Sequence, residues 1–168
     1  MKDLSAVWGG RPNLRIAAQV QAAVLAFTVL TGVETLPLRA DEPLAAYRID
    51  GDAILDPLDG RRGDAVWGQR IVRDREVGNC LICHTLPIPE ERFQGELGPD
   101  LAGVAGRLSA GQIRLRLVDQ TRIDPATIMP PYYRTDGLNN VARRYRARPV
   151  LNAQEIEDVI AYLMTLRE

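Results

Sequence analysis

The chain has 168 residues, of which 46% are hydrophobic and 26% are charged, and its formal net charge is -1. This length is enough for one domain with a hydrophobic core. The nearly neutral charge provides no basic surface of the kind that binds nucleic acid. Lys2 is the only lysine, so a docking surface rich in lysine is also excluded.

Residues 1–40 have the pattern of an export signal. Basic residues precede an apolar run over residues 16–33, and Ala40 ends a possible cleavage site. We expect cleavage after Ala40, so that the mature protein is periplasmic and has no stable association with a membrane. The alternative is an uncleaved anchor, because the apolar run approaches the length that spans a bilayer. Two glutamines near the start of the run make this alternative the weaker one.

The next segment, residues 41–63, is rich in aspartate, glycine and proline. This composition predicts an extended arm with turns. Asp64 is then a candidate N-cap for a helix from Ala65 to Val72, which leads toward the cysteines. We therefore expect an arm over residues 41–63 and one folded domain over residues 64–168.

The sequence Cys-x-x-Cys-His contains Cys80, Cys83 and His84, which are the only cysteines and the only histidine of the chain. It is the attachment signature of a c-type haem, in which both thiols add to haem vinyl groups and the imidazole ligates the iron. The spacing suits this chemistry because residues three apart on a helical turn share a face. Bacteria attach haem c outside the cytoplasm, which agrees with the export signal. We expect one covalently bound haem c.

Three other interpretations of the cysteines are weaker. A thioredoxin-like dithiol needs a βαβ context, and no run typical of a strand flanks the motif. A structural zinc site needs four ligands, which cysteine and histidine cannot supply in this chain. A disulfide between Cys80 and Cys83 would close a very short loop and would stabilise the fold little.

The sequence after the motif predicts a loop and two helices. Prolines and glycines over residues 85–99 exclude a regular helix there. Ser109 begins a capping box and a helix that ends at about Asp119. Asn152 and Glu155 form a second capping box. It precedes an apolar stripe with helical spacing, made of Ile156, Val159, Ile160 and Leu163.

A six-coordinate haem needs a second axial ligand, and methionine is the side chain that remains to supply it. Met1 is lost with the export signal, so Met129 and Met164 are the candidates. Met164 lies in the C-terminal helix, where methionine usually fills gaps in a core. Met129 precedes Pro130 and Pro131, and a loop stiffened by prolines can hold a thioether against iron. We favour Met129; the alternative is a buried loop methionine beneath an open or water-ligated haem.

Residues 98–107 contain two further candidate site residues. A histidine ligand normally donates its other ring N–H to a carbonyl, and the carbonyl of Gly98 or Pro99 is a suitable acceptor. Arg107 could pair with a haem propionate through its planar fork of donors. The alternative for Arg107 is a solvated surface arginine.

Taken together, the haem motif, the sequence Gly-Pro-x-Leu-x-Gly-x-x-Gly-Arg over residues 98–107, the Met-Pro loop and the final Ile-Ala-Tyr-Leu helix resemble class I cytochrome c. The resemblance covers about residues 64–168. It implies an all-α fold in which the first and last helices cross beside the haem. In that fold Gly68 or Val72 would lie against Tyr162.

The same resemblance assigns the histidine contact to the carbonyl of Pro99 and the second axial ligand to Met129. The chain departs from small members of the family by an insertion, residues 130–151, between the methionine loop and the last helix. The insertion is a candidate surface for an acidic partner, and a solvated face is the alternative. Its basic residues are Arg143, Arg144, Arg146 and Arg148.

Several segments narrow the resemblance to SoxX, the monohaem subunit of the SoxAX complex of bacterial sulfur oxidation. They are residues 51–54, 78–84, 127–130 and, most discriminating, the Tyr-Tyr-Arg-Thr-Asp-Gly-Leu sequence over residues 132–138. The family transfers electrons within an enzyme that conjugates thiosulfate to a cysteine of the SoxYZ carrier. The resemblance therefore implies three partners: a SoxA-like subunit with the catalytic cysteine, a transient SoxYZ-like carrier, and a small cytochrome c that accepts electrons.

The chain has no third cysteine for catalysis, so we expect an electron relay with no catalytic residue of its own. A free-standing class I cytochrome c that shuttles electrons is one alternative. The insertion favours the subunit, because a shuttle needs only a small docking face. A haem sensor or a peroxidase-like enzyme is another alternative, but the two prolines after Met129 favour a fixed axial ligand.

Overall fold

The computed structural model describes residues 43–167, and the export signal expected at residues 1–40 lies outside them. In the described residues the regular elements are helical, and the only strand-like pairing is an isolated bridge between Asp50 and Ala53. The all-α prediction is confirmed. The helices are α2 (Ala65–Arg73), α3 (Val104–Arg107), α4 (Ala110–Asp119) and α5 (Ala153–Leu163), and the 3-10 turns are η1 (Cys80–Ile82), η2 (Gln120–Arg122) and η3 (Arg143–Tyr145). Over residues 43–167, no helix has the length and apolarity needed to cross a bilayer.

Side-chain caps determine where the three longer helices begin. The carboxylate of Asp64 accepts two backbone hydrogen bonds from the first turn of α2. Ser109 and Gln112 form a complete capping box at α4, and Asn152 and Glu155 form another at α5. Each cap satisfies backbone N–H groups that have no partner inside the helix. The predicted starts of all three helices are therefore confirmed.

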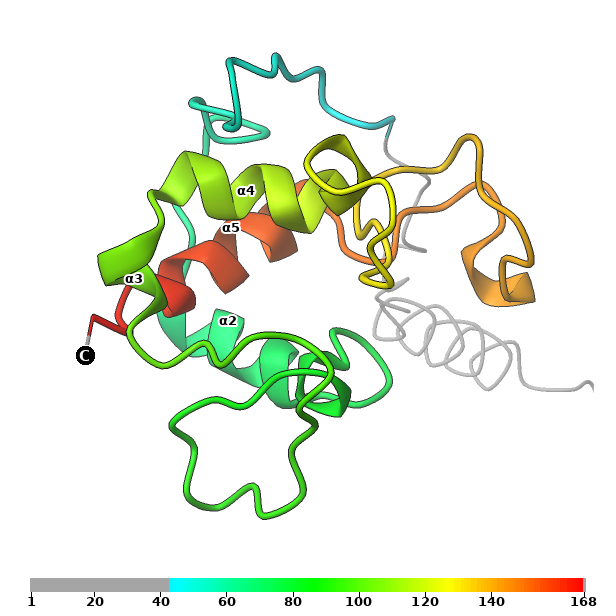
Figure 1. Ribbon diagram of the computed structural model, residues 1–168. Coiled ribbons are helices and arrows are strands. Elements are labelled where there is room, and N and C mark those ends of the chain that lie inside the picture. The colour runs from blue at the N-terminus through cyan, green and yellow to red at the C-terminus, as the bar shows by residue number, and fades with distance from the viewer. Residues whose placement is uncertain (1–42, 168) are drawn as a thin grey trace, which may run out of the picture. The chain divides into compact units, whose positions relative to one another are not determined.

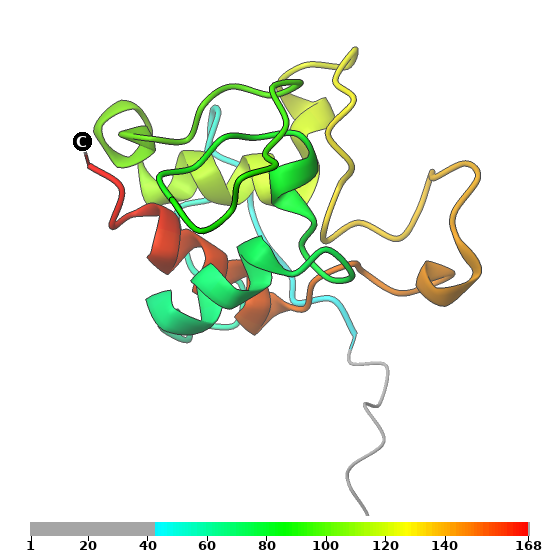
Figure 2. The same cartoon turned by 90° about the horizontal axis from the view of Figure 1, so that it is seen from below.

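Helices α2 and α5 cross in direct contact, as both cartoon views show (Figures 1 and 2). Gly68 lies at the crossing, where a Cβ atom would collide with the carbonyl of Asp158 and would come within 2.9 Å of the Tyr162 Cβ. Glycine is therefore the residue that lets the two backbones approach this closely. Ile71 and Val72 bury the rest of this face of α2. The predicted stripe of α5 is buried as well, at Ile156, Val159, Ile160 and Leu163.

The N-terminal arm belongs to the core of the domain. Ile54 and Leu58 are buried, and both make hydrogen bonds to the helices. The N–H of Ile54 donates to the carbonyl of Gly111 at 3.0 Å, and the N–H of Leu58 donates to the carboxylate of Glu157 at 3.0 Å. The described part of the arm thus forms one compact unit with the helical residues.

A buried ion pair joins the arm, α4 and α5. Arg114 and Glu157 are each 4% exposed, and the guanidinium meets the carboxylate through two bonds of 2.7 and 2.8 Å. Arg114 also donates to the carbonyl of Ile54 at 2.7 Å. Breaking a buried pair by removing one partner typically costs about 3–5 kcal/mol, because it leaves an uncompensated charge. This pair therefore makes the arm part of the stable fold.

The insertion after the methionine loop is closed at its base by a backbone contact. The N–H of Leu151 donates to the carbonyl of Tyr132 at 3.0 Å, so residues 133–150 form a closed excursion. Figures 1 and 2 show it extending away from the helices. Its far end is tied to the turn before the cysteines: Arg144 pairs with Glu76 at 3.1 Å, and the Tyr145 hydroxyl donates to the Glu76 carbonyl at 3.2 Å.

Candidate functional site

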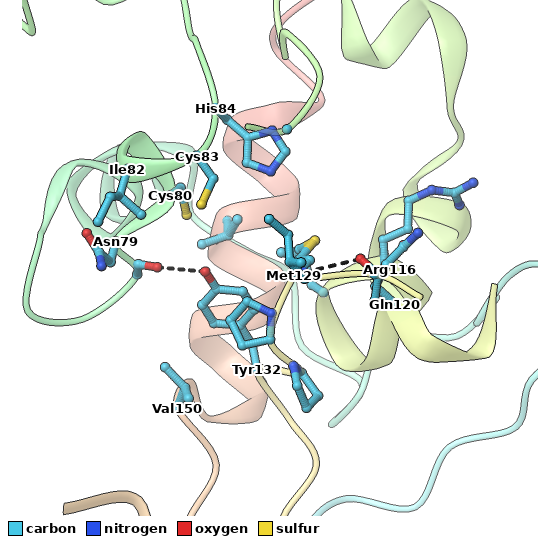
Figure 3. A pocket seen from close by; sticks show the side chains of 18 of the residues that line it. Asn79, Cys80, Ile82, Cys83, His84, Arg116, Gln120, Met129, Tyr132 and Val150 are labelled. Atoms are coloured by element: carbon cyan, nitrogen blue, oxygen red, sulfur yellow. Dashed lines mark hydrogen bonds between the residues drawn. The ribbon is translucent and has the colours of Figure 1, made fainter. Parts of the chain in front are cut away.

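The cysteine motif folds as a tight 3-10 turn. Asn79 precedes the turn in the left-handed region at φ 51°, and the N–H groups of Cys83 and His84 both donate to the carbonyl of Cys80, at 3.1 and 3.0 Å. The turn directs Cys80, Cys83 and His84 into one space (Figure 3). Cys80 is buried and Cys83 is half-buried, and neither forms a disulfide.

A cavity of about 890 Å³ lies in front of the motif, and its volume falls within the range of about 300–1,000 Å³ that is usual for ligand and cofactor sites. Its wall is formed by the cysteine motif, the loop after the motif, α4, the methionine loop and the insertion. The apolar part of the lining comes from distant parts of the chain. It includes Val72, Leu101, Val104, Ile113, Leu117, Val159 and Leu163.

The ring of His84 is held on two sides. Its Nδ1 lies 2.7 Å from the carbonyl oxygen of Pro99, which was one of the two acceptors expected from the sequence. Nδ1 is then the donor, so the lone pair is on Nε2, the nitrogen that can ligate a metal. Gly98 covers the ring so closely that a Cβ atom there would come within 2.6 Å of Nδ1. Gly98 was expected from the sequence only as a possible acceptor, whereas in the structure its missing side chain makes room for the imidazole.

Met129 lies in the loop that follows η2, and it lines the same cavity as His84 (Figure 3). It is half-buried, and its N–H donates to the Thr127 hydroxyl at 3.2 Å. Met164 follows the last turn of α5, packs against the core and does not line the cavity. Of the two methionines considered from the sequence, Met129 is thus the one that shares a cavity with His84.

Tyr132 links the methionine loop to the cysteine motif. It is 7% exposed, and its hydroxyl donates to the carbonyl of Gly78 at 2.8 Å. It also lies close to Cys80, whose thiol pKa is raised to about 11 by burial. Burial likewise raises the pKa of the Tyr132 hydroxyl, which therefore stays protonated as a donor. The sequence does not predict this hydrogen bond, because the partner of the hydroxyl is 54 residues away in the chain.

Arg107 lines the cavity, and the partners it shows are backbone carbonyls. Its two terminal nitrogens donate to the carbonyls of Ala102 and Asp100, at 2.6 and 2.7 Å. The guanidinium therefore braces the loop that carries Pro99. Pairing with a haem propionate stays a prediction, and it would have to share a guanidinium that already makes these two bonds.

A second charged cluster lies behind the methionine loop. Asp119, at 1% exposed, accepts from Arg134 at 2.8 Å and from the Thr121 hydroxyl. Two buried atoms of this region, Gln120 Oε1 and Arg134 Nε, have no hydrogen-bond partner among the described residues, and both residues line the cavity. Buried polar atoms are normally paired, so these two atoms are exceptions in the packing behind the methionine loop.

The cavity fits a c-type haem by the chemistry of its donors. It presents two thiols at the attachment spacing, an imidazole with a free Nε2, a thioether and an apolar wall. No group of three or more histidine, cysteine or acidic residues in the described chain could hold a bare metal ion. An iron held by a porphyrin needs only two side chains as ligands. The lack of a cluster for a bare metal ion is therefore compatible with a haem site.

The chain is similar to the solved structure described as "Crystal structure of SoxXA from P. pantotrophus". The two share 32% sequence identity, and the similarity covers 73% of this chain and 95% of that chain with a TM-score of 0.68. The described residues thus have the class I cytochrome c fold. No protein-family model matches the sequence, and no curated protein matches it.

Proposed function

The chain belongs to the SoxXA-type cytochromes, and we propose that it is the monohaem, electron-transferring subunit of a sulfur-oxidising complex of this type. One observation carries the proposal: a single cavity brings together Cys80, Cys83, His84 and Met129. The chain has no other cysteine that could act as a nucleophile. These side chains can hold a redox centre, but they cannot carry a sulfur substrate in covalent form once both thiols are used for attachment.

In this proposal Cys80 and Cys83 would hold one haem c covalently, and His84 Nε2 and the Met129 sulfur would ligate its iron. When bound, it supplies a one-electron iron couple. The bond from His84 Nδ1 to Pro99 fixes the imidazole and raises its basicity as a ligand. The thioether of Met129 favours reduced iron and so raises the potential relative to a second imidazole. The thioether's effect on the potential suits an electron acceptor.

The proposed role is to take electrons from a partner and release them to another. The catalytic cysteine would belong to a SoxA-like subunit, which joins thiosulfate to a cysteine of a SoxYZ-like carrier in the periplasm. Forming that bond releases two electrons, whereas one haem stores one. The electrons would therefore leave in two successive transfers to a small cytochrome c.

Exposed apolar side chains at the mouth of the cavity support a stable partner on this face. Ile82, Leu97 and Ile128 line the cavity, and their exposed fractions are 55%, 71% and 73%. Phe93, at 83%, lies in the same loop as Leu97. Apolar surface of this kind is usually covered by a partner when it is contiguous. It favours a subunit over a shuttle that docks only transiently.

The test is to produce the chain with a c-type haem attachment system, together with a SoxA-like cytochrome that carries a catalytic cysteine. We expect one covalent haem per chain by mass, a one-electron redox titration, and a stable one-to-one complex on gel filtration. A matched preparation of Cys80→Ala/Cys83→Ala should contain no covalent haem. A haem-loaded chain that does not associate with the partner would indicate the free-standing shuttle, and a chain without haem would exclude both roles.

A further inference from the structure

We propose that the ion pair between the buried Asp119 and the half-buried Arg134 is a clamp that sets how firmly Met129 is presented to the haem iron. The inference rests on the proposed function, because it assumes a haem with Met129 as a ligand. It assigns Asp119 and Arg134 a positioning role and no contact with a partner or a substrate. Four observations on the described residues lead to it.

The first observation is that the methionine loop is closed at its base by three neighbouring contacts. Beyond the loop, the N–H groups of Tyr132 and Tyr133 donate to the carbonyls of Leu117 and Val118, at 3.0 and 3.4 Å. The next residue, Arg134, meets the carboxylate of Asp119 at 2.8 Å. Three successive residues after the loop therefore pair in register with the last three residues of α4.

The second observation is that the loop itself has few other attachments near the sulfur ligand. The only hydrogen bond from the backbone of Met129 to a described residue goes to the hydroxyl of Thr127, two residues earlier. Pro130 and Pro131 have no N–H to donate. The position of Met129 relative to the loop base is consequently set by the two stiff prolines between them. Whatever fixes the base also fixes the sulfur.

The third observation is that Asp119 is fully engaged and almost inaccessible to water. At 1% exposed, its Oδ1 accepts from the N–H and hydroxyl of Thr121, at 3.1 and 2.5 Å, and its Oδ2 accepts from Arg134. Arg122 also approaches Oδ2, at 3.4 Å, from a side chain that is 59% exposed. A charge at such depth is destabilised when its closest partner, the 22% exposed Arg134, is removed, whereas a mostly solvated partner such as Arg122 contributes little.

The fourth observation connects the clamp to the cavity. Arg134 lines the cavity with its Nε buried and unpaired, and so does Gln120 with its Oε1. The Arg134 side chain therefore holds the loop base through its ion pair and is also one of the residues that line the cavity. A change in the ion pair should alter the exchange of the axial ligand before it alters the rest of the fold.

The experiment compares Arg134→Gln with Arg122→Gln in the haem-loaded protein, because both variants remove a guanidinium from the same carboxylate. The readout is competition: the affinity of the oxidised protein for added imidazole, together with the pH at which the weak far-red band of sulfur-ligated ferric haem disappears. We expect Arg134→Gln to raise imidazole affinity by about tenfold or more and to move the loss of the band to lower pH. Arg122→Gln should change imidazole affinity less than about twofold.

Two further variants separate positioning from loss of fold. Arg134→Lys retains a cation and should restore part of the wild-type resistance to imidazole, while Asp119→Asn should match Arg134→Gln. Equal effects of Arg134→Gln and Arg122→Gln, or wild-type imidazole affinity in both Arg134→Gln and Asp119→Asn, would overturn the clamp. A wild-type protein that lacks the far-red band would instead overturn the ligation in the proposed function. Helix content measured by circular dichroism identifies a variant that fails to fold, in which case Arg134→Lys decides.

Discussion

The two sides of the cavity are held by different kinds of contact. On the histidine side the backbone makes the contacts nearest the imidazole, and the Arg107 side chain adds two bonds to backbone carbonyls of the same loop. The N–H of Gly98 donates to the carbonyl of Cys83 at 2.7 Å, and the N–H of Leu101 donates to the carbonyl of Thr85 at 2.9 Å. The acceptor for His84 Nδ1 is the backbone carbonyl of Pro99. Such bonds survive most side-chain changes.

On the methionine side, side chains make several of the decisive contacts. Arg134 meets Asp119, the hydroxyl of Tyr132 reaches Gly78, and the hydroxyl of Thr127 receives the N–H of Met129. Each can be removed by one substitution. The comparison teaches that the imidazole is fixed by the fold itself, while the thioether is fixed by a few replaceable groups. Ligand exchange should therefore be confined to the methionine side.

The largest effect is expected from adding a methyl group on the histidine side. In Gly98→Ala the new Cβ would come within 2.6 Å of His84 Nδ1, and the ring cannot move away without losing its bond to Pro99. We expect the variant to lose about 1–3 kcal/mol of stability and most of its covalent haem. Urea unfolding and the haem content of the purified protein measure the two effects.

Gly106→Ala is the matched control for that substitution, because its Cβ would meet only the carbonyl of Arg167 at 3.5 Å, an ordinary contact. Stability within about 0.5 kcal/mol of wild type is the expected result for the control. If Gly98→Ala behaved like Gly106→Ala, the close fit of the imidazole to its loop would be wrong.

The next effect in size tests the ligand on the methionine side. Met129→Ala should abolish the far-red band and lower the reduction potential by more than about 60 mV, the shift that a tenfold change in relative affinity produces for one electron. Spectroelectrochemical titration of the haem-loaded protein measures both quantities. Met164→Ala is the control, and a loss of the band in that variant instead would transfer the ligand role to Met164.

A smaller effect is expected from Tyr132→Phe, which leaves the carbonyl of Gly78 without its donor. Tyr132 is 7% exposed, so the loss should be about 1–3 kcal/mol, measured by urea unfolding. Tyr145→Phe removes a similar bond, from a hydroxyl to the carbonyl of Glu76, at an exposed position. It should lose less than about 1 kcal/mol, and an equal loss in both variants would contradict the importance of burial.

The smallest effect on stability is expected at the insertion. Arg143 and Arg146 are exposed and form no ion pair with any described residue. Arg143→Glu/Arg146→Glu should change the free energy of unfolding by less than about 0.5 kcal/mol. It should weaken binding to an acidic partner and reduce the salt dependence of that binding, measured by titration at two ionic strengths. Unchanged affinity would leave these arginines as a solvated face.

Local signals predicted most of the helical framework. The capping boxes at Ser109 and Asn152 and the cap at Asp64 act within one turn, so four residues of sequence contain the whole interaction. The haem motif is equally local. The helix crossing at Gly68 came from the resemblance to a known family, because nothing in the neighbouring sequence states which helix it meets.

Contacts between distant residues could not be predicted. Arg114 sits on the apolar side of α4, where sequence patterns expect a hydrophobic residue, and its partner Glu157 lies 43 residues away. This ion pair explains why the arm belongs to the core. Composition alone had predicted only that the arm is extended. The close fit of Gly98 to the imidazole depends likewise on a ring 14 positions earlier, and the glycine by itself indicated only a turn.

The adjacent tyrosines after the methionine loop have a consequence for how this loop can vary in evolution and in engineering. Tyr132 reaches Gly78 before the cysteines, while the hydroxyl of Tyr133 receives the N–H of Ala45 in the arm at 2.8 Å. Surface loops usually tolerate insertions and deletions. Here a change of one residue in length would shift both tyrosines out of register at the same time. Residues 120–131 should therefore accept many substitutions but keep a constant length, and a library of loop lengths with haem content as the screen would reveal that constraint.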